Sequence, residues 1–525
     1  MVRNAIIMAA GTASRFAPLS YEKPKALLRV KGEILIERQI CQLREAGVTD
    51  ITIVVGFMAE KFYYLQEKYG INIVLNADYN LYNNTSSIIK VIERLNNTYI
   101  CSSDNYFPHN IFLENPSTSY YSALYSTGYT NEYCITTDQE NHITNVTIGG
   151  TNSWYMVGHA YFDDYFSAAF REILKREYSK ESTRNEYWED VYIRHIKDLP
   201  LMKIHKYQPH EIEEFDTLEE LRLFDKTYIN DTGCQMFKNI CQILKCEEKD
   251  ISEINILKKG MTNCSFAFTC NVDKNKYVYR HPGLGTHELI NRTNEYHSLQ
   301  LAKKEHIDDT FIAMDQKSGW KISHYIDDVE TLTPASIQTE ENIKKISSIY
   351  KKLHNSSSKL KHEFNIFDEM VKYDMLIKQY NAAMYEGWDS VKENLLLIKE
   401  KLTKLGVTLC PCHNDAVPEN FIKTRDNKIF LIDWEYSGMN DPLADIASLF
   451  LESLFTEEKQ NLFLFFYYNG NVPEGTTTKI LCYQILWDFL WAQWTIIKEA
   501  KGDNFGLYGI NRFHRGLSNM QILLK

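Results

Sequence analysis

The first stretch that could do chemistry is a loop of small residues followed by two separated cations. Residues 5–10 are continuously apolar and lead into Gly11, and Arg15 and Lys25 follow. A backbone that must come close to phosphate oxygens needs small side chains, so that its N–H groups can face the ligand. Guanidinium and ammonium groups add the positive charge that phosphates require. We therefore predict a nucleotide-phosphate site formed by Ala10, Gly11, Arg15 and Lys25, although the glycine alone would fit an ordinary strand–turn–helix connection.

Two aspartates of the N-terminal half are candidates for binding a divalent cation. Asp104 follows a strand-like stretch at residues 99–103, and Asp216 lies in the segment 214–217. Mg²⁺ in proteins is held by a few carboxylates together with phosphate oxygens. Each aspartate alone could equally be a helix cap or a turn residue, so their positions leave both interpretations open.

The N-terminal motifs resemble those of the sugar-phosphate and choline-phosphate nucleotidyltransferases, over roughly residues 1–228. The resemblance rests on the strings at residues 8–19 and 23–27, although Ala13 stands where many members carry a second glycine. It implies that an NTP and a phosphomonoester give an NDP-linked product and pyrophosphate, and that Arg15 and Lys25 are catalytic. It also implies that Asp104 and Asp216 hold Mg²⁺. The stretch 82–86, with Asn83 and Asn84, would lie beside the base and the substrate.

A second set of polar residues lies in the C-terminal half. Asp415, Asn420 and Asp433 follow the spacing H-x-D-x-x-x-x-N, and two apolar residues precede the last aspartate. This spacing matches the protein-kinase-like small-molecule kinases, whose chemistry needs a base for the alcohol and two metal ligands on the phosphates. The resemblance implies that Asp415 is the base and that Asn420 and Asp433 hold Mg²⁺.

Residues upstream resemble the choline-kinase branch of that family. Residues 260–266 are similar to its phosphate loop, and Arg280 stands at the position of the phosphate-pairing lysine, where this branch commonly has arginine. The resemblance implies that Glu295 holds Arg280 and that both serve nucleotide binding. Asp445 would brace the catalytic loop without touching substrate.

Aromatic side chains beside carboxylates gather near both motifs. A quaternary ammonium cannot donate a hydrogen bond, so proteins hold it against aromatic faces, often with a carboxylate. The string at residues 187–190 also resembles the choline-binding segment of phosphocholine cytidylyltransferases. Aromatic residues are about as often part of the core, so either role fits each of them. The predicted headgroup residues are Trp154, Tyr187, Trp188 and Glu189 in the N-terminal half, and Trp434, Glu435, Trp487 and Trp491 in the C-terminal half.

Length and charge limit the class of protein. A chain of 525 residues exceeds what one hydrophobic core usually supports, so two or three domains are expected. The net charge of -11 argues against a nucleic-acid binder. Eleven cysteines without a paired CxxC signature fit reduced thiols. No apolar stretch is long enough to span a bilayer, and we expect a cytoplasmic protein without membrane insertion.

The order of predicted elements indicates two architectures. Alternating strands and helices up to about residue 216 predict an α/β, Rossmann-like domain with a mostly parallel sheet, whose ligand crevice lies at the carboxyl ends of the strands. Short strands between residues 254 and 280 and helices beyond about 335 predict a protein-kinase-like bilobal (α+β) domain. We place the domains at 1–228 and 229–525, with the small lobe of the second reaching about residue 325.

Together the two halves describe consecutive reactions and resemble bacterial bifunctional phosphocholine cytidylyltransferase/choline kinases. The implied substrates are choline, phosphocholine, ATP and CTP, with Mg²⁺ at both sites. Alternatives are the same reactions on ethanolamine or an aminoalkyl phosphonate, a sugar nucleotidyltransferase fused to an aminoglycoside-type kinase, and a nucleotide-binding pseudoenzyme. The tryptophan-rich segments weigh against the sugar nucleotidyltransferase fused to a kinase. The intact charged residues weigh against the pseudoenzyme. The sequence leaves the oligomeric state open, a homo-oligomer included.

Overall fold

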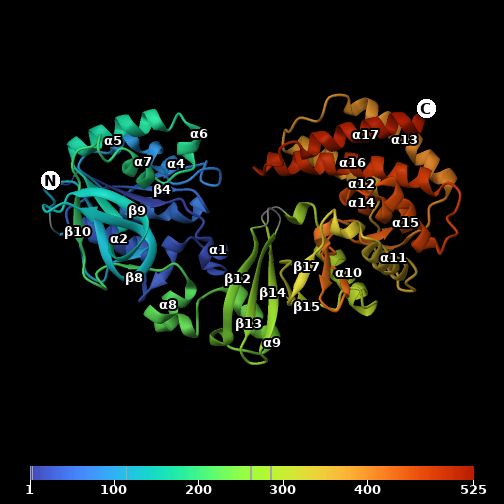
Figure 1. The fold of residues 1–525 in the computed structure, drawn as a ribbon, viewed down its shortest axis with the longest axis horizontal. Helices are drawn as coiled ribbons and strands as arrows, with labels where there is room; N and C mark the ends of the chain where they lie inside the picture. The colour runs from blue at the N-terminus through green and yellow to red at the C-terminus, as the bar shows by residue number, and fades with distance from the viewer. Residues whose placement is uncertain (1, 3, 114, 260–262, 284–285) are drawn as a thin grey trace. The chain divides into compact units, whose positions relative to one another are not determined.

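The structure is a computed structural model that describes residues 2, 4–113, 115–259, 263–283 and 286–525. The chain divides into two compact units, Met1–Asp250 and Ile251–Lys525, each with its own sheet and hydrophobic core (Figure 1). Part of the predicted kinase phosphate loop, residues 260–262, lies outside the described residues.

A seven-stranded sheet of order β10-β8-β9-β6-β1-β4-β5 forms the centre of the first unit. Its strands are β1 (Asn4–Ala9), β4 (Asp50–Val55), β5 (Asn72–Leu75), β6 (Thr98–Ser102), β8 (Tyr120–Thr137), β9 (Ile143–Phe162) and β10 (Lys203–Lys206). Four of the six neighbouring pairs are parallel, and only the pairs that involve β9 are antiparallel. The predicted mostly parallel α/β sheet is thus confirmed. A separate antiparallel ribbon pairs β7 (Asn105–Tyr106), which follows β6 in the chain, with β11 (Glu213–Glu214), which follows β10.

Helices cover both faces of this sheet because alternate residues of its strands are apolar on both sides. Ile6 of β1 belongs to one core cluster, and its neighbours Ala5 and Ile7 belong to the other. The first cluster includes residues of α4 (Thr85–Lys90), α5 (Asp164–Glu177) and α7 (Trp188–Arg194); the second includes residues of α2 (Leu35–Glu45) and α3 (Tyr64–Tyr69). A 3₁₀ turn at Ile92–Arg94 follows α4 in the chain.

The second unit begins with a five-stranded antiparallel sheet of order β12-β13-β14-β16-β15. Its strands are β12 (Ile251–Lys259), β13 (Asn263–Cys270), β14 (Asn275–Pro282), β15 (Phe311–Met314) and β16 (Lys321–His324), and α10 (Arg292–Lys304) lies between β14 and β15 in the chain. Figure 1 shows β12 to β14 in green and the later helices in orange and red. This succession of a small sheet and a helical part is the predicted kinase-like fold.

The helical part contains one large core cluster. Its helices are α11 (Glu340–His354), α12 (Ile366–Gln379), α13 (Trp388–Leu405), α14 (Pro442–Glu452), α15 (Glu457–Tyr468), α16 (Thr476–Ala500) and α17 (Tyr508–Leu524). Short strands interrupt it: β17 (Val329–Thr331), β18 (Cys410–Cys412), β19 (Phe421–Thr424), β20 (Ile429–Leu431) and β21 (Gly438–Asn440). The sequence motif of the second site lies on the loops that follow β18 and β20.

Residues 229–250 belong to the first compact unit, whereas the sequence analysis ended the first domain at residue 228. This segment contains α9 (Gln235–Leu244), whose Phe237 and Ile240 side chains are fully buried. It follows α8 (Leu218–Phe224), and Arg222 of α8 donates a hydrogen bond to the Glu248 carbonyl. The apolar residues of α9 therefore pack within the first unit, which the sequence pattern alone did not reveal.

In the described part of the chain, no helix is both long and apolar enough to cross a membrane.

Candidate active sites

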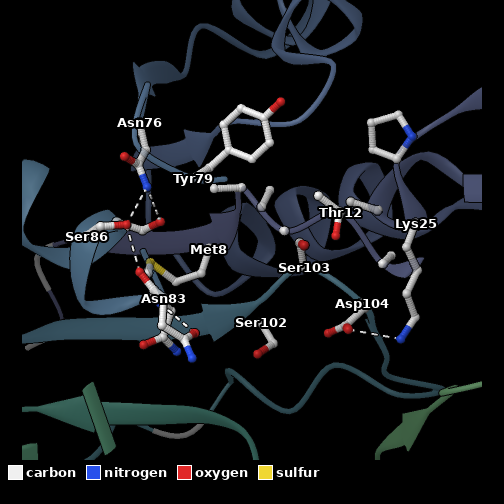
Figure 2. A pocket seen from close by; sticks show the side chains of 18 of the residues that line it. Met8, Thr12, Lys25, Asn76, Tyr79, Asn83, Ser86, Ser102, Ser103 and Asp104 are labelled. Atoms are coloured by element: carbon white, nitrogen blue, oxygen red, sulfur yellow. Dashed lines mark hydrogen bonds and ion pairs between the residues drawn. The ribbon is translucent and has the colours of Figure 1, made fainter. Parts of the chain in front are cut away.

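A cavity of about 430 Å³ opens at the carboxyl ends of β1 and β6, where the sequence analysis expected a ligand crevice. One wall is the backbone that follows β1, including Ala10 and Gly11. Figure 2 shows Lys25 and Asp104 on one side of the cavity and Asn83 and other polar residues on the opposite side. A Cβ atom added to Gly11 would meet no heavy atom within 4 Å, so this wall leaves the cavity open. The space can admit a ligand close to the backbone N–H groups.

The loop after β1 contains a residue in an unusual conformation. Ala13 has a φ of 46°, in the left-handed region that favours glycine. The loop bends at Ala13 in the way that glycine adopts most easily, which fits the glycine that the resemblance led us to expect there. Ala13 therefore adopts a left-handed backbone conformation that glycine would adopt without the steric cost of a Cβ atom.

Each of the two cations predicted to be catalytic is paired with one of the two predicted metal ligands. Lys25 Nζ lies 2.9 Å from Asp104 Oδ2, and Arg15 Nη1 lies 3.0 Å from Asp216 Oδ2. The Lys25 side chain is 9% exposed, whereas that of Arg15 is 73% exposed. Residues up to about 200 positions apart in the sequence thus meet in one charged group. A bound phosphate could pair with Lys25 and Arg15 in place of the aspartates. A bound metal ion could likewise pair with Asp104 and Asp216 in place of the two cations.

A third carboxylate, Glu214, joins this group and was not among the predicted site residues. The protein around its side chain reduces its hydration, and the negative charges of Asp104 and Asp216 add to this effect, so the pKa of Glu214 rises to about 8. Its side chain is nevertheless accessible to solvent. Carboxylate oxygens close to one another are the donor set that Mg²⁺ prefers. Asp104, Glu214 and Asp216 supply carboxylates of the kind that hold Mg²⁺, but among the described residues their oxygens do not all lie within 4.8 Å of one another.

Asn83 and Asn84 immediately precede α4, and both line the same cavity. Asn84 accepts a hydrogen bond from the backbone N–H of Trp188 and donates one to Glu189 Oε2, at 2.7 and 3.3 Å. The hydroxyl of Tyr121 donates to the other oxygen of Glu189 at 3.0 Å. Burial raises the pKa of Glu189 to about 7, against the effect of these hydrogen bonds. With a pKa of about 7, the Glu189 carboxyl is about equally divided between its neutral and charged forms near pH 7.

The predicted headgroup aromatics of this half lie in different surroundings. Tyr187 lines the cavity and is half exposed. Trp188 is buried and its ring contacts those of Tyr121 and Phe162. The ammonium of Lys206 lies 5.4 Å from the centre of the Trp154 ring. These positions favour Tyr187 as a ligand contact. They favour a core role for Trp188, and Trp154 already holds a cation of the protein.

The second site is built around a buried ion pair. Arg280 of β14 contacts both carboxylate oxygens of Glu295 of α10, at 2.6 and 2.9 Å. Arg292 lies 2.7 Å from Glu295 and 3.2 Å from Glu435. Burial would raise the pKa of Glu295, but the charge of Arg280 and those of Lys321 and Arg292 outweigh it and hold the pKa at about 2. The pair Arg280–Glu295 was implied by the resemblance to the choline-kinase branch, whereas Arg292 and Lys321 were not predicted to take part.

The structure brings Asp415, Asn420 and Asp433 together beside Arg280. Asn420 Nδ2 donates to the backbone carbonyl of Asp415 at 2.8 Å and to its Oδ2 at 3.3 Å. Asp433 has a φ of 66°, and its buried Oδ1 accepts no hydrogen bond but lies 3.6 Å from Arg280 Nη1. Such a buried acceptor fits a metal ligand. Burial and the charge of Asp433 raise the pKa of Asp415 well above its usual range.

Asp445 holds the loop that carries Asp415. Its carboxylate accepts hydrogen bonds from the backbone N–H groups of His413 and Asn414 at 2.8 and 2.9 Å, and His354 Nε2 lies 3.1 Å away. Potential ligand atoms of His354, Cys410 and Cys412 lie within 4.8 Å of one another. Because Tyr467 and Asp445 already bind the two nitrogens of His354, we interpret this group as part of the same brace.

The tryptophans predicted to contact a headgroup in the second site differ in burial. Trp434 and Trp487 are fully buried, and their indole N–H groups donate to the backbone carbonyls of Leu431 and Ala444. This burial favours a structural role over the predicted ligand contact. Trp491 is 6% exposed and packs edge-on against Tyr436. Burial and the nearby charges of Glu435 and Asp415 raise the pKa of Tyr436, and burial and the charges of Glu452 and Asp415 raise that of Tyr508, so both tyrosines are further candidates.

Comparison with known proteins agrees with this division. Residues 5–110 match the MobA-like NTP transferase domain, and residues 254–515 match choline/ethanolamine kinase. Protein LicA of Haemophilus influenzae is 32% identical over 250 residues, 46% of this chain and 92% of that protein. The 2-aminoethylphosphonate cytidylyltransferase of Lancefieldella rimae is 36% identical over 230 residues, 43% of this chain and 93% of the relative. The choline-phosphate cytidylyltransferase of Streptococcus pneumoniae is 31% identical over 228 residues, 43% of this chain and 99% of the relative.

Fold and sites thus define a transferase with two parts, one of the nucleotidyltransferase class and one of the kinase class. The chain belongs to the choline/ethanolamine kinase family through its C-terminal half and to the NTP transferase family that includes these cytidylyltransferases through its N-terminal half.

Proposed function

We propose that this chain makes CDP-choline in two steps. The C-terminal half phosphorylates choline with ATP, and the N-terminal half transfers CMP from CTP to phosphocholine and releases pyrophosphate. The observation that carries the proposal is the presence of both halves in one chain, because the product of the kinase is the substrate of the cytidylyltransferase.

The fused kinase also helps to choose between the two substrates named for the N-terminal relatives. A kinase that acts on an alcohol forms an oxygen–phosphorus bond and gives a phosphate ester. A phosphonate contains a carbon–phosphorus bond, which phosphorylation of an alcohol cannot form. The kinase half would therefore supply phosphocholine or phosphoethanolamine to the first site, but not 2-aminoethylphosphonate.

In the kinase half, Asp415 would accept the proton of the choline hydroxyl while the oxygen attacks the γ-phosphorus of ATP and ADP leaves. Arg280, held by Glu295, would pair with the ATP phosphates. Asn420 and Asp433 would hold Mg²⁺, which neutralises phosphate charge when bound. The raised pKa of Asp415 fits a base that shares its surroundings with other carboxylates.

In the N-terminal half, a phosphate oxygen of phosphocholine would attack the α-phosphorus of CTP in line, and pyrophosphate would leave without a covalent enzyme intermediate. Lys25 and Arg15 would stabilise the charge that develops on the pyrophosphate, and Asp104 and Asp216 would hold Mg²⁺. Ala10, Gly11, Asn83 and Asn84 would hold the nucleotide in the cavity. Tyr187 and Glu189 would face the headgroup.

Choline is favoured over ethanolamine by the surroundings of Asp415. Trp491 and Tyr436 place aromatic rings near Asp415, which suits a trimethylammonium group, whereas the carboxylate of Glu435 is already paired with Arg292. A primary ammonium would leave its N–H donors facing rings.

A product assay tests the proposal. The full chain is incubated with Mg²⁺, ATP and CTP and with choline, ethanolamine or 2-aminoethylphosphonate. We expect CDP-choline and pyrophosphate to form from choline only when both nucleotides are present. Formation of a CMP adduct of the phosphonate at a higher kcat/KM than that of phosphocholine would contradict the substrate assignment.

A further inference from the structure

The segment that carries Lys25 is held at both ends by residues near the C-terminal edge of the first unit. We define the Lys25 loop as residues 23–28 and the clamp as residues 225–236. The loop follows α1 (Leu19–Glu22) and ends before the short strand β2 (Arg29–Val30). None of the clamp residues is among the predicted catalytic or binding residues.

At the first end, Glu22 is bound by the N-terminus of α9. Its Oε1 accepts hydrogen bonds from the Met236 N–H at 2.9 Å and the Cys234 thiol at 3.3 Å, and its Oε2 accepts one from the Gln235 N–H at 3.0 Å. A carboxylate at a helix N-terminus satisfies N–H groups that have no partner within the helix and interacts favourably with the helix dipole. Glu22 is therefore fixed to α9 by three bonds.

At the second end, two clamp residues bind the backbone after the loop. Asp225 Oδ2 accepts a hydrogen bond from the Lys31 N–H at 2.6 Å, and the Tyr228 hydroxyl donates to the Arg29 carbonyl at 2.8 Å. Asp225 and Tyr228 are both buried. The loop is thus bound to the clamp on either side of Lys25.

Only two residues separate Glu22 from Lys25, and one of them is Pro24. Proline restricts the backbone to a narrow range of φ, so little freedom remains between the anchor and the lysine. The Lys25 side chain is almost entirely buried, and its ammonium ends beside Asp104. A shift of Glu22 would therefore move the ammonium relative to the phosphates of the ligand.

We infer that the clamp positions Lys25 for cytidylyl transfer, so that the N-terminal catalytic unit includes residues beyond 228. Glu22 and the N-terminus of α9 are positioning groups and touch no reacting atom. The kinetic part of this inference rests on the function proposed above.

A pair of substitutions at Gln235 isolates one bond of the clamp. Gln235 is the first residue of α9, where proline is well tolerated, and the preceding Cys234 has the extended backbone that proline requires. Gln235→Pro removes only the N–H that binds Glu22 Oε2, and Gln235→Ala keeps it as the matched control. Both variants lose the side-chain bond to Asn239 equally.

In the full chain we expect Glu22→Ala to lower kcat of cytidylyl transfer by up to about a hundredfold, because a displacement of about 1 Å can cost that much. Gln235→Pro lowers it several-fold, and Gln235→Ala leaves it unchanged. Glu22→Gln keeps one acceptor oxygen and gives an intermediate rate. KM for CTP changes less than kcat, and the kinase rate of the same samples stays within error, while the melting temperature of the Glu22 variants falls by only about 2–4 °C through the interactions lost at the helix N-terminus.

Amide hydrogen exchange across residues 19–31 is measured in the same variants without substrate. We expect faster exchange in Glu22→Ala and Gln235→Pro only. Unchanged exchange, or wild-type kcat in both variants, overturns the inference, and so does a parallel loss of both activities with a lower melting temperature. If the wild-type chain transfers no CMP, the proposed function fails, and the exchange result alone decides the positioning role.

Discussion

The charged groups of the two sites are organised in opposite ways. In the N-terminal unit, Arg15 and Asp216 form a pair in which both side chains are about half exposed or more. In the C-terminal unit, Arg280 and Glu295 form a pair that is almost completely buried. An exposed pair contributes little to stability and can exchange partners when a ligand arrives. A buried pair is costly to break, so it keeps its geometry before the nucleotide binds. The Arg15–Asp216 pair can therefore rearrange around a ligand, whereas the Arg280–Glu295 pair, like the largely buried Lys25–Asp104 pair, is held before a ligand binds.

The largest expected effect comes from removing the groups that carry the chemistry of one site. Asp415→Asn should lower choline phosphorylation by about a thousandfold, because general-base catalysis contributes roughly 10²–10⁴. CDP-choline formation from supplied phosphocholine should remain. Asp104→Asn should have the reciprocal effect, because it removes a carboxylate that we propose as a ligand for Mg²⁺.

Both rates are measured for each variant by product analysis at constant Mg²⁺. Loss of both activities in a folded Asp415→Asn protein would show that the two sites depend on each other. Near wild-type CTP turnover in Asp104→Asn would mean that this residue is no metal ligand.

The second prediction tests the contrast between buried and exposed pairs. Glu295→Gln should lower the free energy of unfolding by about 3 kcal/mol, because it leaves Arg280 and Arg292 buried without their main counter-charge. Asp216→Asn should change it by less than about 1 kcal/mol, although it stops cytidylyl transfer. Urea denaturation of the full chain measures both values, with each unit followed separately by amide hydrogen exchange of its own peptides, because both variants impair the activity of their own unit. Equal changes in the two variants would remove the proposed difference between the sites.

The third prediction concerns the headgroup in the kinase half. Trp491→Leu should raise KM for choline by roughly thirtyfold and affect ethanolamine less, because a desolvated cation–π contact is worth about 2 kcal/mol. Trp487→Phe is the matched control. Its ring is buried behind the site, so this change should lower stability and leave KM nearly constant. If only Trp487→Phe raised KM for choline, the result would show that Trp487 and not Trp491 contacts the headgroup.

The smallest effect is expected from Glu189. The pKa of this carboxyl is raised to about 7, so it is mostly neutral below pH 6 and mostly charged above pH 8. A cationic headgroup prefers the charged form, and KM for phosphocholine should therefore fall roughly tenfold as the pH rises between these values. Glu189→Gln should lose this dependence while keeping that of the substrate phosphate. An identical pH profile in variant and wild type would show that Glu189 does not face the headgroup.

How far the sequence predicted these sites depends on the kind of contact. Arg280 and Glu295 lie in the stretch that resembles the choline-kinase branch, and that resemblance implied their pairing. Glu214 was missed as a site residue because its proximity to Asp104 arises from the pairing of β7 with β11. Tryptophan composition also misled the prediction in part: Trp434 has the residue type of a cation-binding side chain, but it packs on His413 below the catalytic loop.

The sequence by itself predicted the two fold classes, and the resemblance of its motifs to known families implied the two reaction classes and most of the charged residues of each site, but not Glu214, Arg292 or Lys321. These features follow from local patterns: alternating apolar strands, a small-residue loop, and polar residues at fixed separations. Only the tertiary structure decided which charges face one another, which aromatic rings remain near a ligand, and that α9 holds the Lys25 loop. The physical reason is that burial and pairing depend on contacts between segments up to about 200 residues apart, and such contacts leave no mark on local spacing.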